Sequence, residues 1–269
     1  MTTLAKRELK EKRPLEPIIV KGRGGGFNNL LHKELSQWWG TSMWWIQLII
    51  WVLILNGVST IVALSELMAP AELLQEVVFT FLPIAVGAVA MGTVITTQGV
   101  IVGEKQLGTA AWVMSKPASR AAFVLTKAIA YAIGFWTVAL AVPAIIFIIV
   151  TRLLIPAPLA LLPFLAGLGI AALSQLFYLM LTLMLGTLYN ARGPIVGIGI
   201  ALVMTGLLLK GFIPPVIMMV TPWYLPDISA SVAVQTPLPG NWFVPLIATG
   251  CWIVLFTAVA LWRFSREEF

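Results

Sequence analysis

The chain has 269 residues, of which 59% are hydrophobic and 10% are charged, and its mean hydropathy is +0.96. An ordinary soluble domain is about 45–50% apolar and about 25% charged, so this composition excludes a soluble globule. It also excludes a disordered chain, which requires low hydrophobicity, and one cysteine excludes a disulfide framework. The composition predicts an all-α integral membrane protein.

The formal net charge of +6 raises the question of a nucleic-acid partner. Eight of the 17 Lys and Arg residues lie before residue 42, and most of the others lie between hydrophobic runs. Membrane proteins place their charge in this way, so no nucleic-acid partner is predicted. Residues 1–26 are predicted to be a flexible basic tail, which either contacts anionic lipid or is simply solvated.

Residues 27–39 have the pattern of an amphipathic helix that lies in the membrane plane. Its apolar side chains fall within about half a helical turn, and Asn29, Lys33 and Ser36 lie opposite. Glu34 is expected at the edge of the apolar arc. A protein partner or a nearby Lys would explain Glu34 there, and reaching out to water is the alternative.

Six stretches have about the 20 apolar residues that a helix needs to cross the hydrocarbon core. The fifth is short unless it continues through Lys210 to Ile213. The predicted spans are Met43 to Leu64, Val77 to Val102, Ala128 to Val150, Leu159 to Tyr189, Pro194 to Leu209 and Phe243 to Trp262.

Six spans place both termini on one side of the membrane. The connecting segments on that side hold 15 of the 17 Lys and Arg residues. Positive residues remain in the cytoplasm, so both termini are predicted to be cytoplasmic.

Two connecting segments have structure of their own. Between spans two and three, Pro117 predicts that a short helix ends near Ser115 and that a new helix begins at Ala118 or Ser119. Between spans five and six, residues 210–241 contain six prolines, which exclude one long helix. Short re-entrant helices are expected there, either as a lid over an exit path or as an interfacial plug.

The spans contain polar residues but no Asp, Glu, Lys, Arg or His. This disfavours a proton relay. The polar residues either face a substrate path or form hydrogen bonds between helices. Candidates for a substrate path are Gln47, Asn56, Gln98, Gln175 and Tyr178, with Ser174 beside them.

No catalytic or phosphate-binding motif is present. His32 and Cys251 have no partner that would indicate an active site, and a G-x-x-x-x-G-K-[ST] loop is absent. The chain is therefore not predicted to be an enzyme or to bind a metal or cofactor. Energy for any work would come from another polypeptide. Small residues at a four-residue spacing, Gly193, Gly197, Ala201 and Thr205, predict a packing face for a helix of this chain or of a second copy.

The segment Glu104 to Lys127 contains E-K-x-x-G-T, S-K-P-x-S-R and F-V-L-T-K. It resembles the loop between the second and third helices of ABC-2 type transporter permeases. Lys33-Glu34-Leu35 resembles part of that family's N-terminal interfacial helix, and Trp262-Arg263-Phe264 resembles its last turn. The resemblance assigns residues 27–269 to an ABC-2 type transmembrane domain.

The resemblance implies a permease subunit in the plasma (inner) membrane of a prokaryote. It would pair with a second permease, as a homodimer or heterodimer, and dock separate ATPase subunits that bind ATP and Mg. The charge-free apolar spans suit a lipid-like, peptide or other amphiphilic substrate, and the resemblance together with the small outer loops favours export. A non-transporting membrane scaffold or sensor is the alternative. By the resemblance, the residues that couple to the ATPase are Lys33, Glu34, Glu104, Gly108, Thr109, Lys116, Pro117, Ser119 and Arg120.

Overall fold

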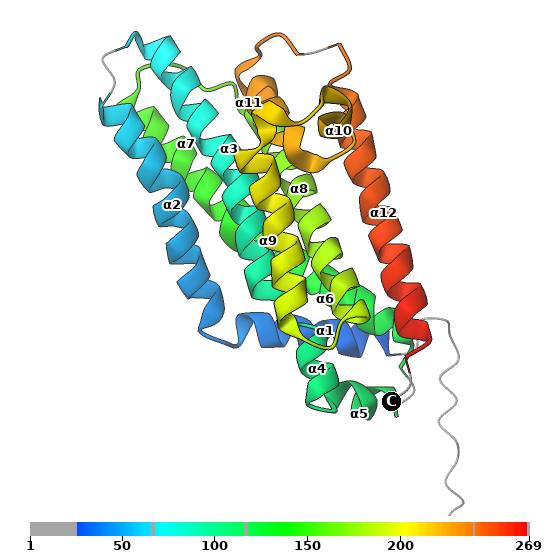
Figure 1. Cartoon of the computed structure of the whole chain (residues 1–269). Helices are drawn as coiled ribbons and strands as arrows, with labels where there is room; N and C mark the ends of the chain where they lie inside the picture. Colours follow the sequence, from blue (N-terminus) through cyan, green and yellow to red (C-terminus); the bar gives the residue numbers. More distant parts are fainter. Residues whose placement is uncertain (1–25, 66–67, 116–117, 239, 268–269) are drawn as a thin grey trace, which may run out of the picture.

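The computed structural model describes residues 26–65, 68–115, 118–238 and 240–267, and within these ranges every regular element is a helix. The predicted tail therefore lies almost wholly outside the described residues, and so do Lys116 and Pro117. Figure 1 shows a bundle of long helices with a lateral helix, α1, across one end. We call this the α1 end.

Five helical stretches among the described residues are long and apolar enough to cross a membrane, which confirms the predicted class. Helix α9, Arg192–Leu208, is the fifth predicted span. Its 17 residues extend about 26 Å, slightly less than the hydrocarbon core. A single 3-10 turn, Lys210–Phe212, follows it. The five long stretches are Met43–Ser65 (α2), Pro70–Gln106 (α3 and α4), Arg120–Leu154 (α6, η1 and α7), Leu161–Leu188 (α8) and Phe243–Ser265 (α12).

The third span changes its helical geometry at a proline. It runs from α6 (Arg120–Phe135) through a π-helical turn, η1 (Trp136–Ala141), into α7 (Val142–Leu154), where Pro143 is the second residue. Proline has no N–H to donate within the helix, and the neighbouring π turn absorbs the resulting mismatch. The Pro143 carbonyl also accepts a hydrogen bond from Asn56 Nδ2 on α2 at 3.2 Å.

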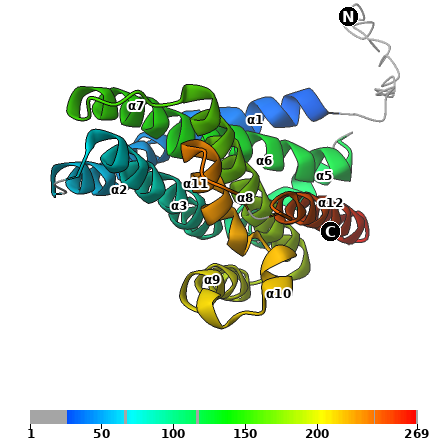
Figure 2. The same ribbon diagram turned by 90° about the horizontal axis from the view of Figure 1, so that it is seen from above.

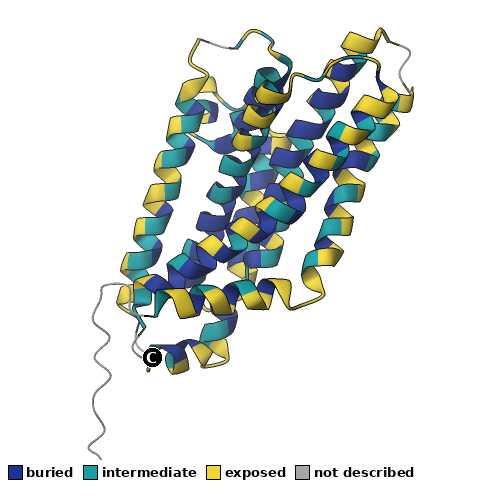
Figure 3. Cartoon of the chain, turned by 180° about the vertical axis from the view of Figure 1, so that it is seen from behind, coloured by how far each residue is buried: buried dark blue, intermediate teal, exposed yellow. Residues whose placement is uncertain are grey.

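Helix α8 is the centre of the bundle. It packs against α3, α11 and α12, and Figure 2 shows it surrounded by the other helices while α9 lies at the rim. Apolar side chains fill the interior in two clusters, one of which contains the ring contacts of Phe147 with Phe81 (4.2 Å) and Phe164 (5.3 Å). Figure 3 shows that the outward faces of the long helices are exposed and their inward faces buried. That distribution suits helices surrounded by lipid.

The segment between α9 and α12 forms the short helices that its prolines predict. They are α10 (Pro215–Met219), the 3-10 turn η3 (Pro222–Tyr224) and α11 (Leu225–Val234). Helix α11 packs against α8 and α3, and Ser229 Oγ donates to the Gly167 carbonyl at 2.9 Å. This segment is therefore part of the bundle at the end opposite α1.

Candidate functional site

The lateral helix α1 (Phe27–Trp39) has a charged residue at the centre of its buried face. Leu30, Glu34 and Trp38, spaced by four residues, are its buried side chains. The prediction that Glu34 lies at the edge of the apolar arc was wrong. The alternative of a nearby Lys is what the structure shows, because Glu34 Oε1 lies 2.9 Å from Nζ of Lys127 on α6.

Four charged residues, Lys33, Glu34, Glu104 and Lys127, form what we call the ion-pair cluster. Lys127 Nζ lies 2.8 Å from Glu104 Oε1, and Lys33 Nζ lies 2.9 Å from the same oxygen and 3.3 Å from Glu34 Oε1. Lys127 and Glu34 are buried, whereas Lys33 is partly exposed. Two cations balance two carboxylates, so the cluster can be excluded from water without an unpaired charge.

The pKa of Lys33 reflects this pairing. Burial by itself lowers the pKa of the ammonium group, but the hydrogen bond to Glu104 and the charges of Glu34 and Glu104 outweigh it. The net result is a pKa above the ordinary value, so Lys33 is charged at neutral pH. The cluster therefore holds three elements together electrostatically: α1, α4 and the middle of α6.

Helices α4 (Val102–Gln106) and α5 (Thr109–Met114) form an elbow that projects beyond α1 (Figure 1). Gly108, with a φ of 70°, adopts the left-handed conformation that the turn between them needs. Lys105 Nζ lies 2.8 Å from Oε1 of Glu267, which follows α12. This ion pair attaches the elbow to the C-terminal end of α12. The outer surface of the elbow carries two large apolar side chains, Leu107 (78% exposed) and Trp112 (62% exposed).

The predicted break after the elbow is confirmed. Helix α5 ends at Met114, and Ser119 caps α6 by accepting a hydrogen bond from the Ala122 N–H at 3.0 Å. The side chain of Arg120 donates to the carbonyls of Ser265 (2.5 Å) and Glu267 (2.8 Å). Arg120 thus anchors the last turn of α12 to the start of α6.

The predicted coupling residues consequently fall into three places. Lys33, Glu34 and Glu104 belong to the ion-pair cluster, whereas Gly108 and Thr109 lie in the elbow, where Thr109 Oγ1 donates to the Glu104 carbonyl at 3.2 Å. Ser119 and Arg120 lie at the start of α6, and contact of any of these residues with an ATPase stays a prediction. The sequence analysis did not assign a site role to Lys127, Leu107 or Trp112. A Lys just before an apolar run is typical of a solvated membrane anchor. The sequence around Lys127 therefore does not indicate that this residue has a buried partner.

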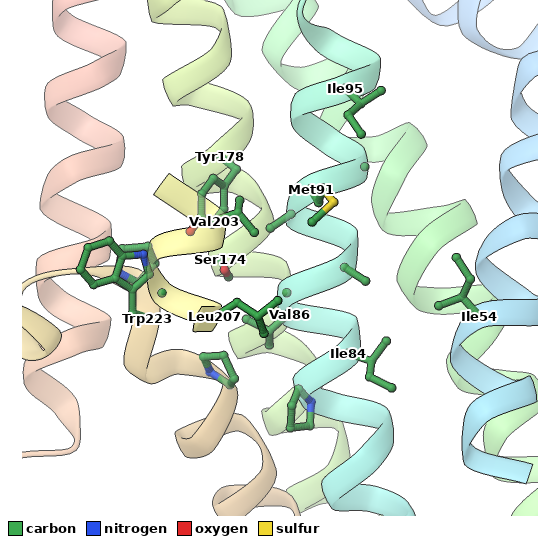
Figure 4. A pocket seen from close by; sticks show the side chains of 18 of the residues that line it. Ile54, Ile84, Val86, Met91, Ile95, Ser174, Tyr178, Val203, Leu207 and Trp223 are labelled. Atoms are coloured by element: carbon green, nitrogen blue, oxygen red, sulfur yellow. The ribbon is translucent and has the colours of Figure 1, made fainter. Parts of the chain in front are cut away.

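A groove of about 740 Å³ lies among the long helices of the bundle. Its walls come from α2, α3, α8, α9 and the segment from η3 to α11, and they are mostly apolar (Figure 4). Trp51 and Trp223 contribute indole rings. Lys210 and Asp227, which form an ion pair with each other, lie at the end away from α1.

The groove brings together only some of the predicted substrate-path residues. Gln47 and Tyr178 line it, as does Ser174. Asn56 instead bonds to the Pro143 carbonyl, and Gln98 Nε2 donates to the Ile95 carbonyl at 2.8 Å. Gln175 is buried and does not line the groove. Asn56 therefore follows the alternative reading, a hydrogen bond between helices.

Within the described part of the chain, no group of three His, Cys, Asp or Glu side chains is placed to hold a metal ion. No protein-family model matches the chain, and no curated protein matches it. Helix length and hydropathy define the class, a multi-pass helical membrane protein.

Proposed function

We propose that this chain is the transmembrane permease subunit of an ATP-driven ABC transporter of the ABC-2 type, and that it exports an amphiphile. The single observation that carries the proposal is the elbow, a short helical element held outside the bundle by the ion-pair cluster. Rigid attachment matters because only a rigid element transmits the rigid-body movement of a docked partner.

The exposed face of the elbow supports a docking role. Leu107 and Trp112 are large apolar side chains exposed on the elbow, and the elbow itself projects beyond the level of α1 (Figure 1). Aromatic residues in such positions are typical anchors of protein interfaces. In this proposal the α1 end faces the cytoplasm of a prokaryotic cell, and separate ATPase subunits that bind ATP and Mg dock on the elbow.

Helix α3 offers a direct route from the elbow to the groove. Its residues between Pro83 and Thr96 line the groove, and the chain continues from its end at Thr97 into α4 within five residues. Movement of the elbow would shift α3 and the lateral helix together, because the ion-pair cluster joins α4 to α1. The groove would then open or close by alternating access.

The outer face of α9 supports a second permease copy. Gly193, Gly197 and Ala201 are exposed, and a Cβ at Gly193 or Gly197 would meet no atom within 4 Å. The predicted small-residue face therefore has no partner helix within the described chain, and small residues of this kind permit close approach of another helix. We propose that this helix belongs to a homodimer or heterodimer partner.

The test uses the tagged full-length chain purified from its native membrane, with phosphate release as the readout. ATP hydrolysis is expected to co-purify with the chain and to be lost in the Leu107→Ser/Trp112→Ser variant. Leu153→Ser/Leu162→Ser, at two exposed positions on spans three and four, is the matched control and should retain it. Substitutions in the ion-pair cluster are unsuitable for this test, because they would also disturb the packing of α1.

Two outcomes would overturn the proposal: purified chain without any co-purifying ATPase, or hydrolysis that is unaffected by the elbow variant. The first outcome would favour the alternative function, a non-transporting scaffold or sensor.

A further inference from the structure

The dimensions of the groove indicate what kind of molecule fits it. Along α3 it extends from Pro83 to Thr96, a length of about 20 Å at the helical rise. One leaflet of the hydrocarbon core is about 15 Å thick. The groove is therefore long enough to take an extended apolar chain that reaches through one leaflet.

The groove is open toward the surrounding lipid. The exposed residues of its lining are Ile50 and Ile54 on α2, Ile95 on α3 and Leu207 on α9. Figure 4 shows Ile54 on one side of α3 and Leu207 on the other. A hydrophobic molecule dissolved in the bilayer would reach the groove sideways, between α2 and α9, without crossing water.

Two polar atoms in this apolar lining have no hydrogen-bond partner within the described chain: Gln47 Oε1 and Ser174 Oγ. Gln47 is 8% exposed and Ser174 is 1% exposed, and both line the groove. Figure 4 shows Ser174 directed into it. A carboxamide oxygen only accepts hydrogen bonds, so its missing partner is a donor. A buried acceptor without a donor is costly, and a bound ligand can supply that donor.

Glycines in the groove lining allow tryptophan rings to pack directly against the helix backbone. A Cβ at Gly92 would overlap the ring of Trp51, and one at Gly206 would overlap the ring of Trp223. Trp223 is held there by donating Nε1–H to the Leu202 carbonyl at 2.9 Å. A Cβ at Gly87, which also lines the groove, would meet no atom within 4 Å. Gly87 therefore faces open space in which a ligand can lie.

From these observations we infer that the groove binds one long-chain amphiphile. Its apolar chain lies along α3, and a hydroxyl or amide of its polar part donates to Gln47 Oε1. Binding of this ligand stands independently of any ATPase. Its identification as the transported substrate rests on the proposed function.

The probe is a long-chain monoacylglycerol with a diazirine in the chain, added to the full-length chain in phosphatidylcholine vesicles and photoactivated. Labelled peptides are expected from the groove segments of α2, α3 and α9. Gly87→Leu should abolish labelling there, because its side chain fills the groove. Gly250→Leu on α12, where a Cβ meets no atom within 4 Å and which does not line the groove, is the matched control and should leave labelling unchanged. If Gly87→Leu does not fold, Leu207→Trp fills the groove from α9.

The donor is tested with the dimethyl ether of the same probe, which lacks both O–H groups. One hydrogen bond of ordinary strength predicts about fivefold to tenfold stronger labelling by the monoacylglycerol. Gln47→Leu should remove this preference. Gln98→Leu, which does not line the groove, should retain it.

Equal labelling by both probes, or labelling spread over all lipid-facing helices and insensitive to Gly87→Leu, would overturn the inference. Groove labelling in a chain that carries no ATPase would leave the inference standing and overturn the proposed function. The two failures are therefore distinguishable.

Discussion

Lys127 Nζ and Glu34 Oε1 lie 2.9 Å apart although 93 residues separate them in the sequence, and both side chains are almost fully excluded from solvent. Each charge is tolerated inside the protein only because the other is present. The pair therefore fixes which face of α1 meets α6. Together with Glu104, it also determines where the elbow is held.

Removing Lys127 should destabilise the protein strongly. Lys127→Met leaves the Glu34 carboxylate buried beside only the partly exposed Lys33, and breaking a buried ion pair costs about 3–5 kcal/mol. Denaturant titration in detergent measures the free energy of unfolding. The double variant Lys127→Met/Glu34→Leu removes the stranded charge as well and should be more stable than the single variant. A double variant less stable than the single one would contradict this account of the cluster.

The contact of Trp38 with α6 should be sensitive to one added methyl group. A Cβ at Gly134 would overlap the Trp38 indole, which also packs against the rings of Tyr131 and Phe135 at 5.1 Å each. Gly134→Ala is expected to cost about 1–3 kcal/mol by overpacking. Gly57→Ala on α2, where a Cβ meets no atom within 4 Å, should be neutral or stabilise by up to about 1 kcal/mol. Equal effects of the two substitutions would exclude close packing of Trp38 as the cause.

The last turn of α12 should loosen when Arg120 is replaced. Arg120→Met removes the donor to the Ser265 and Glu267 carbonyls, each hydrogen bond being worth about 0.5–1.5 kcal/mol. Amide hydrogen exchange within residues 262–267 is expected to become about fivefold to 150-fold faster. Arg152→Met, at the other end of the third span, is the control and should leave this exchange rate unchanged. Protection that survives in Arg120→Met would show that packing alone fixes this turn.

The stabilisation that Lys33 gives to the folded state should be lost at high pH. Its pKa is raised above the ordinary value of 10.5, so the folded state holds the proton more tightly than the unfolded state. The stabilisation is fully present below about pH 10.5 and is lost as the pH rises through the pKa of the folded state. Thermal melting of the wild-type chain and Lys33→Met should therefore differ by a constant amount up to about pH 10 and converge above it. A difference in melting temperature between the two chains that grew with pH would contradict the raised pKa of Lys33.

Much of the fold could be predicted because it depends on local sequence. Charge-free runs of sufficient length predicted the long helices, and Pro117 with Ser119 predicted where α5 ends and α6 begins. The prolines of residues 210–241 predicted short helices. The candidate site was harder to predict from the sequence. Gln47 and Tyr178 line the groove, but Asn56, Gln98 and Gln175 do not. Nothing in the neighbouring sequence distinguishes these polar residues, because each lies in an equally apolar run.

The sequence by itself determined the membrane class, the helical segments and the amphipathic character of α1, since hydropathy and turn chemistry act over a few residues. Only the tertiary structure decided that Glu34 is central in the buried face of α1, that Lys127 is its partner and that four helices with η3 and α11 enclose a groove. Those relationships arise when helices distant in the chain pack in one register. A register of this kind is selected by shape and charge across the interface, for which a single helix carries no local signal.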